Sequence, residues 1–549
     1  MTLRISRSKI VLYLILICVI SLGLKLYTID FALPPHSDDF GFIVDSMQYN
    51  QGDFFISQKK NPGWPLFLAP FLSIINSDNF LDYASIARIL TIGISTVTVI
   101  PMYILARRFF AEKYSLVAAC LFAFEPHLNY NSGGALSEPL LILVLITSMI
   151  FILHDKTKYH YLAFIFTGLC WWVRLEAIYP VIAIIIIFFI VHRHKPNSLR
   201  NFSLGIVFLL IIISPLFIQR DLQFDDPFYV WYTGTIFADD YTEILTSPEN
   251  AGVVDFVEKH GVLGLMERLA NGLANLLNTL IRISYPYLLI LIPFGILFSL
   301  RPIDQKMKNI KANWTMIITI IAVILIPFAM FEERRWLFPI FPFLIILATI
   351  PIQRVTNHGL NTFSFNENQK SIFLVIVIGV VLLLSSTFTM GIGEFGYGLP
   401  NSALEHEELE FTMYLVENFD GRILRDAISL DYLHYVHFIS IDDADFKSFK
   451  SPRGKDPFPD LYKPGTVWWL SVNGKTIEEL VTNGETKGLK YISILEEGSY
   501  FFPFLNDLYH YEERYPYMEK IFDSDEMNYK EFKIKVFEIN YQKFYDLNG

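Results

Sequence analysis

The chain has 549 residues, of which 53% are hydrophobic and 18% are charged, and its formal net charge at pH 7 is −11. A soluble protein of this length would carry more charge on its surface, so the composition excludes an ordinary soluble globular protein. The apolar residues occur in runs of roughly 17 to 25, the length needed to cross about 30 Å of hydrocarbon. The sequence therefore predicts a polytopic α-helical membrane protein.

About eleven helices are expected to cross the membrane. The predicted spans are residues 8–29, 84–106, 114–131, 137–153, 159–174, 177–192, 202–219, 281–300, 315–331, 336–352 and 371–391. The first apolar run is too long for the core of a signal peptide, and no small-residue cleavage site follows it. We therefore expect it to remain as the first span.

The loops between these spans alternate in charge. One set is rich in Lys and Arg and includes "RISRSK", "RRFFAEK", "HRHKPNSLR" and "RPIDQKMKNIK". Basic loops face the cytoplasm in membrane proteins. The N-terminus is therefore predicted to be cytoplasmic, and the long loops at 30–83 and 220–280 and the region after residue 391 are predicted to be extracytoplasmic.

The first outer loop carries two adjacent carboxylates, Asp38 and Asp39, directly after the first span. Charged groups near hydrocarbon are costly, so they mark either a function or a water-facing helix end. Further along this loop, Pro and Gly flank Trp64 in "KKNPGWPLFLAPF", which predicts a short helix that lies along the membrane surface. Lys60 is then expected at headgroup level, where it could meet a phosphate.

Other charged side chains also fall on the predicted outer side. They are Glu138, Arg174, Glu176, Glu333, Arg334 and Arg335. Each has an ordinary explanation, such as an acid at a helix N-terminus or a basic side chain that snorkels to the interface. Their gathering on one membrane face, together with Asp38 and Asp39, is instead typical of a site for an anionic, lipid-linked substrate.

The chain after the last predicted span has a different composition. Residues 393–549 contain 16 basic and 29 acidic residues, against 28 and 26 in residues 1–392. The run "ALEHEELEFTMYLVENF" predicts a helix, and "GRILRD", "YVHFISI", "GTVWWLSV" and "GLKYISIL" predict short strands. We expect a transmembrane domain at 1–392 and a soluble α/β domain at 393–549, whose acidic charge argues against nucleic acid as a partner.

Five motifs in order resemble a known family. They are the pair Asp38–Asp39, "KNPGWPL" from Lys60, "LSEPL" at 136–140, "RLE" from Arg174 and "ERRW" at 333–336. This order is similar to that of the GT-C glycosyltransferases that use polyprenyl-phosphate sugars, in the branch of the protein O-mannosyltransferases and the aminoarabinose transferase. The chain departs from the family at Asp39, where the family has Glu, and in having two candidates, Arg334 and Arg335, for one arginine.

The resemblance implies an inverting transfer of a sugar from a polyprenyl (dolichyl) phosphate to an acceptor hydroxyl on the outer face, with mannose the commonest sugar. Asp38 is expected to take the hydroxyl proton, with Asp39 or Glu138 orienting it or holding the sugar. The leaving phosphate needs positive charge. Its expected ligands are Lys60, Arg174, Arg334 and Arg335, supported by Glu176, Glu333 and Trp64.

No cofactor is firmly implied. The carboxylates of Asp38, Asp39 and Glu138 could hold Mg²⁺ or Mn²⁺, but the basic residues could take the place of a cation, and we do not expect a metal to be required. The expected partners are the lipid-linked donor, membrane lipids, and an acceptor that is a protein, a glycan or a lipid. The sequence does not distinguish among the sugars or the acceptors.

Three other functions are consistent with part of the pattern. A transporter or flippase of a lipid-linked or anionic solute would place charges near the midplane and show internal repeats, which this sequence lacks. A polysaccharide polymerase or ligase with a pyrophosphate-linked donor would rely on arginine-rich outer loops more than on Asp38 and Asp39. An inactive scaffold would be expected to have lost the acidic pair.

Overall fold

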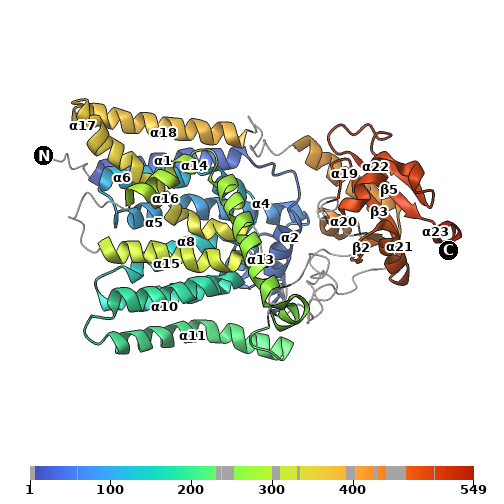
Figure 1. Ribbon diagram of the computed structural model, residues 1–549, viewed down its shortest axis with the longest axis horizontal. Helices are drawn as coiled ribbons and strands as arrows, with labels where there is room; N and C mark the ends of the chain where they lie inside the picture. The colour runs from blue at the N-terminus through green and yellow to red at the C-terminus, as the bar shows by residue number, and fades with distance from the viewer. Residues whose placement is uncertain are drawn as a thin grey trace.

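The computed structural model describes residues 7–57, 60–229, 237, 253–299, 310–329, 334–390, 402–424, 431–440, 465–499 and 501–548. Through Thr389 the described chain is helical, and most of its long helices lie side by side in a bundle (Figure 1). A small mixed α/β region follows and lies beyond one end of this bundle (Figure 1). The predicted fold class, a helical membrane part with a C-terminal α/β part, is confirmed.

The helices of the bundle and its loops follow the predicted spans closely. They are α1 Arg7–Tyr27, α2 Ser37–Asn50, α3 Gly63–Leu72, α4 Phe80–Val97, α5 Val99–Ala106, α6 Glu112–Ala123, α7 Pro126–Asn131, α8 Glu138–Ile152, α9 Thr157–Val173, α10 Ile178–His192, α11 Ser198–Phe224, α13 Val253–Ser284, α14 Leu288–Ser299, α15 Ile310–Phe328, α16 Phe341–Arg354, α17 Leu360–Thr362 and α18 Glu367–Thr389. Two 3₁₀ segments, η1 Leu175–Ala177 and η4 Arg334–Ile340, and a π-helical turn, η5 Val355–Gly359, complete the described part.

Every predicted span overlaps a helix, and the chain is a multi-pass membrane protein. Within the described residues, six helical stretches are long and apolar enough to cross a membrane, or seven if the bent pair α13 and α14 counts as one span. Several other apolar helices are shorter, so the count of eleven stays a prediction. The predicted outer loop at 220–280 is helical at both ends, because α11 continues to Phe224 and α13 begins at Val253.

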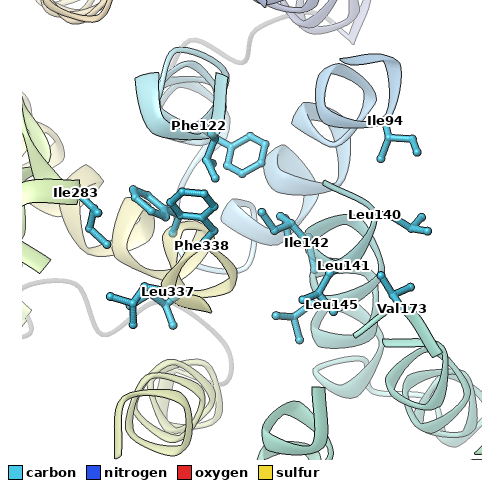
Figure 2. Close-up of a cluster of buried hydrophobic side chains, with 14 of the residues drawn as sticks. Ile94, Phe122, Leu140, Leu141, Ile142, Leu145, Val173, Ile283, Leu337 and Phe338 are labelled. Carbon is cyan, nitrogen blue, oxygen red and sulfur yellow. The ribbon is translucent and has the colours of Figure 1, made fainter. Parts of the chain in front are cut away.

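The core of the bundle lies directly behind the polar motifs. Figure 2 shows side chains of α4, α6, α8, α9, α13 and η4 that meet in one apolar cluster. Leu140 and Leu141 follow Glu138 by two and three residues, Val173 precedes Arg174, and Leu337 follows Arg335 by two. Close-packed cores are hard to deform, so this cluster fixes the backbone from which the charged side chains project.

The C-terminal part contains a five-stranded sheet of order β2-β1-β3-β5-β4. Its strands are β1 Gly421–Leu424, β2 Val467–Leu470, β3 Leu489–Leu495, β4 Met518–Asp523 and β5 Ile534–Ile539. β1 pairs in parallel with β2 and β3, whereas β5 is antiparallel to β3 and β4. The helices are α19 Ser402–Asn418, α20 Leu433–Ser440, α21 Ile477–Thr486, α22 Asn506–His510 and α23 Tyr541–Asn548.

Three of the four predicted strands are confirmed as β1, β2 and β3, and one prediction is wrong. The run "YVHFISI" (residues 435–441) was expected to be a strand, but α20 covers residues 433–440. A short apolar run fits either structure, and tertiary packing decides between them. Here Phe438 packs edge-on against Phe40 of α2, with ring centroids 4.7 Å apart, and Tyr435 lies near Phe80 of α4.

Candidate functional site

The acidic pair of the first loop lies in the first turn of α2, where negative side chains are favoured by the helix dipole. Successive residues of a helix point about 100° apart, so the two carboxylates face different surroundings. Asp38 faces a pair of basic side chains, and Asp39 faces the backbone of residues 134–135. The pair therefore consists of two chemically distinct groups.

Asp38 lies between two cations that come from distant parts of the chain. Its Oδ1 is 3.1 Å from Lys60 Nζ, and its Oδ2 is 2.9 Å from Arg335 Nη2. Lys60 also donates a hydrogen bond to the Asp38 carbonyl at 2.8 Å. The charge of Lys60, with that of Arg335, holds the pKa of the half-exposed Asp38 carboxyl well below its usual range. Asp38 is therefore an anion shared by two cations.

Asp39 is buried, with 3% of its surface exposed, and its Oδ2 accepts a hydrogen bond from the Ala135 amide at 3.1 Å. Burial raises the pKa of this carboxyl. Gly134 permits the close approach, because a Cβ at that position would lie 2.8 Å from Asp39 Oδ2. The second glycine of the Gly-Gly pair before "ALSEPL" thus makes room for Asp39.

A second ionic cluster holds three of the predicted residues together. Arg174 Nη1 is 2.7 Å from Glu138 Oε1, and Arg174 also donates to both carboxylate oxygens of Glu176 at 3.1 Å. Glu138 is fully buried. The helix α9 ends at Val173, which leaves Arg174 in an extended conformation that turns its side chain toward α8. Two carboxylates therefore compensate the charge of Arg174.

Trp64 connects the first loop to the segment that holds Asp39. Its indole is fully buried, and Nε1 donates a hydrogen bond to the Ala135 carbonyl at 2.6 Å. The same residue, Ala135, therefore has its carbonyl held by Trp64 and its amide held by Asp39. The short helix predicted here is present as α3, which begins at Gly63. Its position along the membrane surface stays a prediction.

The arginine-rich motif is described in part. Arg335 contacts Asp38, whereas Glu333 and the side chain of Arg334 lie outside the described residues. Sequence reasoning proposed both arginines as phosphate ligands. Of the two, Arg335 is the one whose contact with the acidic pair is described.

Several buried cations were not singled out from the sequence. Lys25 on α1 donates to Ser21 Oγ and Asn129 Oδ1, both at 2.6 Å, and Arg220 on α11 donates to Asn61 Oδ1 at 2.6 Å. Arg88 on α4 donates to three backbone carbonyls of the 30–34 segment at 2.9 to 3.1 Å. Each is a lone basic residue within or beside an apolar run, which is a signal of function or of a specific partner.

A cavity of about 450 Å³ adjoins the acidic pair. Asp38, Asp39 and Arg335 line it, with Arg88 and residues of the 28–36 and 130–136 segments. The cavity has the size of a small-molecule site and combines a few polar groups with an apolar lining. Sequence reasoning missed part of its wall, which comes from the C-terminal region: Glu405, Asp431 and Tyr432.

The carboxylates considered for a metal do not converge. Asp38 pairs with Lys60 and Arg335, Glu138 pairs with Arg174, and Asp39 accepts from a backbone amide. Across the described part of the chain, no group of three or more His, Cys, Asp or Glu side chains could hold a metal ion. These residues do not fit a divalent cation, and the chemistry below uses none.

Comparisons with known proteins agree on the fold. Residues 59–218 match the family model described as dolichyl-phosphate-mannose-protein mannosyltransferase. The oligosaccharyltransferase of Archaeoglobus fulgidus, in a complex with Zn and sulfate, aligns with a TM-score of 0.57 and 13% identity over 92% of this chain and 71% of that one. A second structure is the archaeal oligosaccharyltransferase AglB from Archaeoglobus fulgidus with an inhibitory peptide and a dolichol-phosphate. It aligns with a TM-score of 0.52 and 12% identity over 88% of this chain and 69% of that one.

ArnT from Cupriavidus metallidurans, bound to undecaprenyl phosphate, aligns with a TM-score of 0.49 and 12% identity over 95% of this chain and 97% of that one. No curated protein matches the chain in sequence. At identities of 12 to 13%, the alignments with the two oligosaccharyltransferase structures show that the chain shares their fold.

Proposed function

The chain has the GT-C fold that its motifs predicted, and on this basis we propose that it transfers a sugar from a polyprenyl-phosphate donor to an acceptor hydroxyl, with inversion at the anomeric carbon. The observation that carries the proposal is the cluster of Asp38, Lys60 and Arg335 beside the cavity. It combines one carboxylate that can accept a proton with two cations that can hold a phosphate. The match of residues 59–218, which include Lys60, to a mannosyltransferase family gives further support.

In this proposal Asp38 is the general base. The acceptor oxygen attacks the anomeric carbon, the bond from that carbon to the phosphate oxygen breaks, and its electron pair leaves with the polyprenyl phosphate. The hydroxyl proton passes to Asp38. Such a proton transfer contributes about 10²- to 10⁴-fold to the rate.

Lys60 and Arg335 hold the donor phosphate. The bound diester carries one negative charge, and the released monoester carries more, so the two cations interact more strongly with the transition state than with the bound donor. The guanidinium of Arg335 can hold two phosphate oxygens at once. Arg174 and Arg334 remain proposed ligands, although the charge of Arg174 is compensated by Glu138 and Glu176.

The ion pairs of Asp38 couple donor binding to the readiness of the base. While both cations contact Asp38, its lowered pKa makes it a weak proton acceptor. A donor phosphate competes for Lys60 and Arg335 and thereby weakens their hold on the carboxylate. The pKa of Asp38 then rises toward its usual value, so Asp38 becomes an effective base when the donor is bound.

We place this reaction on the extracytoplasmic face, together with the C-terminal region. The basic loops of the opposite side support this orientation. A mannose-like sugar is the first donor to examine, because the family description names dolichyl-phosphate-mannose. The acceptor is a protein, a glycan or a lipid of the envelope.

The proposal is tested by incubating the purified protein with radiolabelled polyprenyl-phosphate sugars and native envelope extract. We expect one donor to be consumed, and Asp38→Asn to lower the rate by about 10²- to 10⁴-fold. Asp82→Asn is the matched control, since Asp82 is exposed and does not line the cavity. Consumption of no donor, or full activity of Asp38→Asn, would contradict the proposal, and movement of intact donor across proteoliposomes would favour the transporter.

A further inference from the structure

The cavity beside Asp38 is completed by the C-terminal region. Glu405 on α19, and Asp431 and Tyr432 just before α20, line it together with residues of the first loop. These side chains follow Asp38 by more than 360 residues in sequence. The cavity therefore belongs to both parts of the chain.

Specific contacts hold this wall against the start of α2. The ring of His36 stacks on Tyr432, with centroids 5.3 Å apart, and His36 Nδ1 is 3.9 Å from Asp431 Oδ2. His406 Nε2 is 3.2 Å from Asp30 Oδ2 on the same loop. Because His36 precedes Asp38 by two residues, the wall is fixed next to the proposed base.

The C-terminal wall makes the cavity acidic. Among the described lining residues are five carboxylates, Asp30, Asp38, Asp39, Glu405 and Asp431, against two arginines, Arg88 and Arg335, and one histidine, His36. The C-terminal residues on that lining add two of these acids and no basic side chain. Arg335 is paired with Asp38, and Arg88 is bonded to backbone carbonyls. Acids outnumber basic side chains on this lining, so a second anion would meet like charge.

Unpaired polar atoms on the cavity lining point to a polar ligand. The hydroxyl of Tyr432 is fully buried and has no hydrogen-bond partner among the described residues, and the same holds for Nε of Arg88, a residue that is 6% exposed. Both residues line the cavity. A buried donor without a partner is costly, so such groups call for a ligand atom that bonds them.

From these observations, and resting on the proposed function, we propose that Glu405, Asp431 and Tyr432 form the acceptor-binding wall, which selects an acceptor without negative charge near its reacting hydroxyl. The donor phosphate needs the cations on Lys60 and Arg335, so the acidic wall is left to the other substrate. Tyr432 and the carboxylates can bond hydroxyl or ammonium groups, whereas a carboxylate or phosphate would meet like charge.

The test separates the two substrates of the transfer reaction. With native envelope extract as acceptor, Glu405→Gln, Asp431→Asn and Tyr432→Phe should each raise the half-saturating concentration of extract, and loss of a bond to a charged group should raise it about tenfold. The half-saturating donor concentration should stay within about twofold of wild type. Glu410→Gln is the matched control, because Glu410 is exposed on α19 and does not line the cavity. All variants are first compared with wild type by thermal unfolding.

A second arm uses small alcohols as competing acceptors. Ethanolamine and ethylene glycol should inhibit transfer to the extract more strongly than glycolate, and Glu405→Gln combined with Asp431→Asn should reduce this difference. Equal inhibition by all three alcohols, a change in donor rather than acceptor dependence, or variants that behave like Glu410→Gln would overturn the inference. Each of those results would leave wild-type sugar transfer intact, whereas absence of transfer by wild type would contradict the proposed function itself.

Discussion

Asp38 and Asp39 are neighbours in sequence, but their surroundings are opposite. Asp38 is half-exposed between Lys60 and Arg335, and Asp39 is buried against the Ala135 amide. The sequence and its family resemblance gave Asp38 the role of proton acceptor and Asp39 a supporting role, but they could not predict how different the surroundings of the two carboxylates are. The deciding partner, Arg335, is 297 residues away from Asp38, and no local pattern predicts a contact across that separation.

The opposite pKa directions of the two carboxyls predict opposite effects on stability. The folded chain favours the charged form of Asp38, so this group contributes stability above its unfolded pKa, which is lost as pH falls through the lowered folded pKa. For Asp39 burial raises the pKa, so its charged form opposes folding as pH rises past the unfolded value. We expect Asp38→Asn to lower the unfolding temperature at pH 7 and Asp39→Asn to leave it unchanged or raise it.

Thermal unfolding in detergent, followed by intrinsic fluorescence, measures this difference. Asp82→Asn again serves as the exposed control. A rise for Asp38→Asn together with a fall for Asp39→Asn would contradict the assignment of their environments.

Close backbone contacts between helices bring separate loops together at the site. The start of α3 packs on the end of α9, and a Cβ on Gly63 would lie 2.5 Å from the Trp172 carbonyl carbon and oxygen and 2.7 Å from Val173 N. That contact sets the beginning of α3, and with it Lys60, near the point where Arg174 leaves α9. The glycine of "KNPGWPL" is therefore explained by packing.

We expect Gly63→Ala to destabilise the fold by about 1–3 kcal/mol, the usual cost of overpacking, and to weaken donor binding by shifting α3. Gly23→Ala on α1 is the control, because a Cβ there has no neighbour within 4 Å. Denaturant or thermal unfolding measures the first effect and donor saturation the second. Equal behaviour of the two variants would show that α3 and α9 do not approach so closely.

Elements with a strong local signal were predictable, and those that depend on tertiary partners were not. Long apolar runs correctly predicted a helix at every predicted span, and short runs of strand-favouring residues correctly predicted β1, β2 and β3. The strand predicted at residues 435–441 is instead part of α20, which packs on α2 and α4 through Phe438 and Tyr435. The acidic wall of the cavity was missed because Glu405 and Asp431 carry no motif of their own.

The exterior of the bundle is apolar enough to contact lipid, whereas the cavity is polar enough to hold a polar acceptor. Large apolar side chains are exposed along α1 and α18, for example Leu16 at 53% and Val375 at 68%, where acyl chains can cover them. The stretch from Arg335 to Thr362 is 94% buried within its apolar window and lies in the interior. Arg335 thus stands at the end of a buried central stretch, beside the cavity that the C-terminal region completes.

In the proposed mechanism the donor phosphate takes the two cations that Asp38 holds in its absence. The Kd of undecaprenyl phosphate for the wild-type protein, Asp38→Asn and Arg335→Met measures this exchange of partners. Removal of the competing carboxylate should make Asp38→Asn bind the lipid phosphate more tightly than wild type while it loses sugar transfer, and Arg335→Met should bind it more weakly. Weaker binding by Asp38→Asn, equal to that of Arg335→Met, would show that Asp38 and the donor phosphate do not compete for these cations.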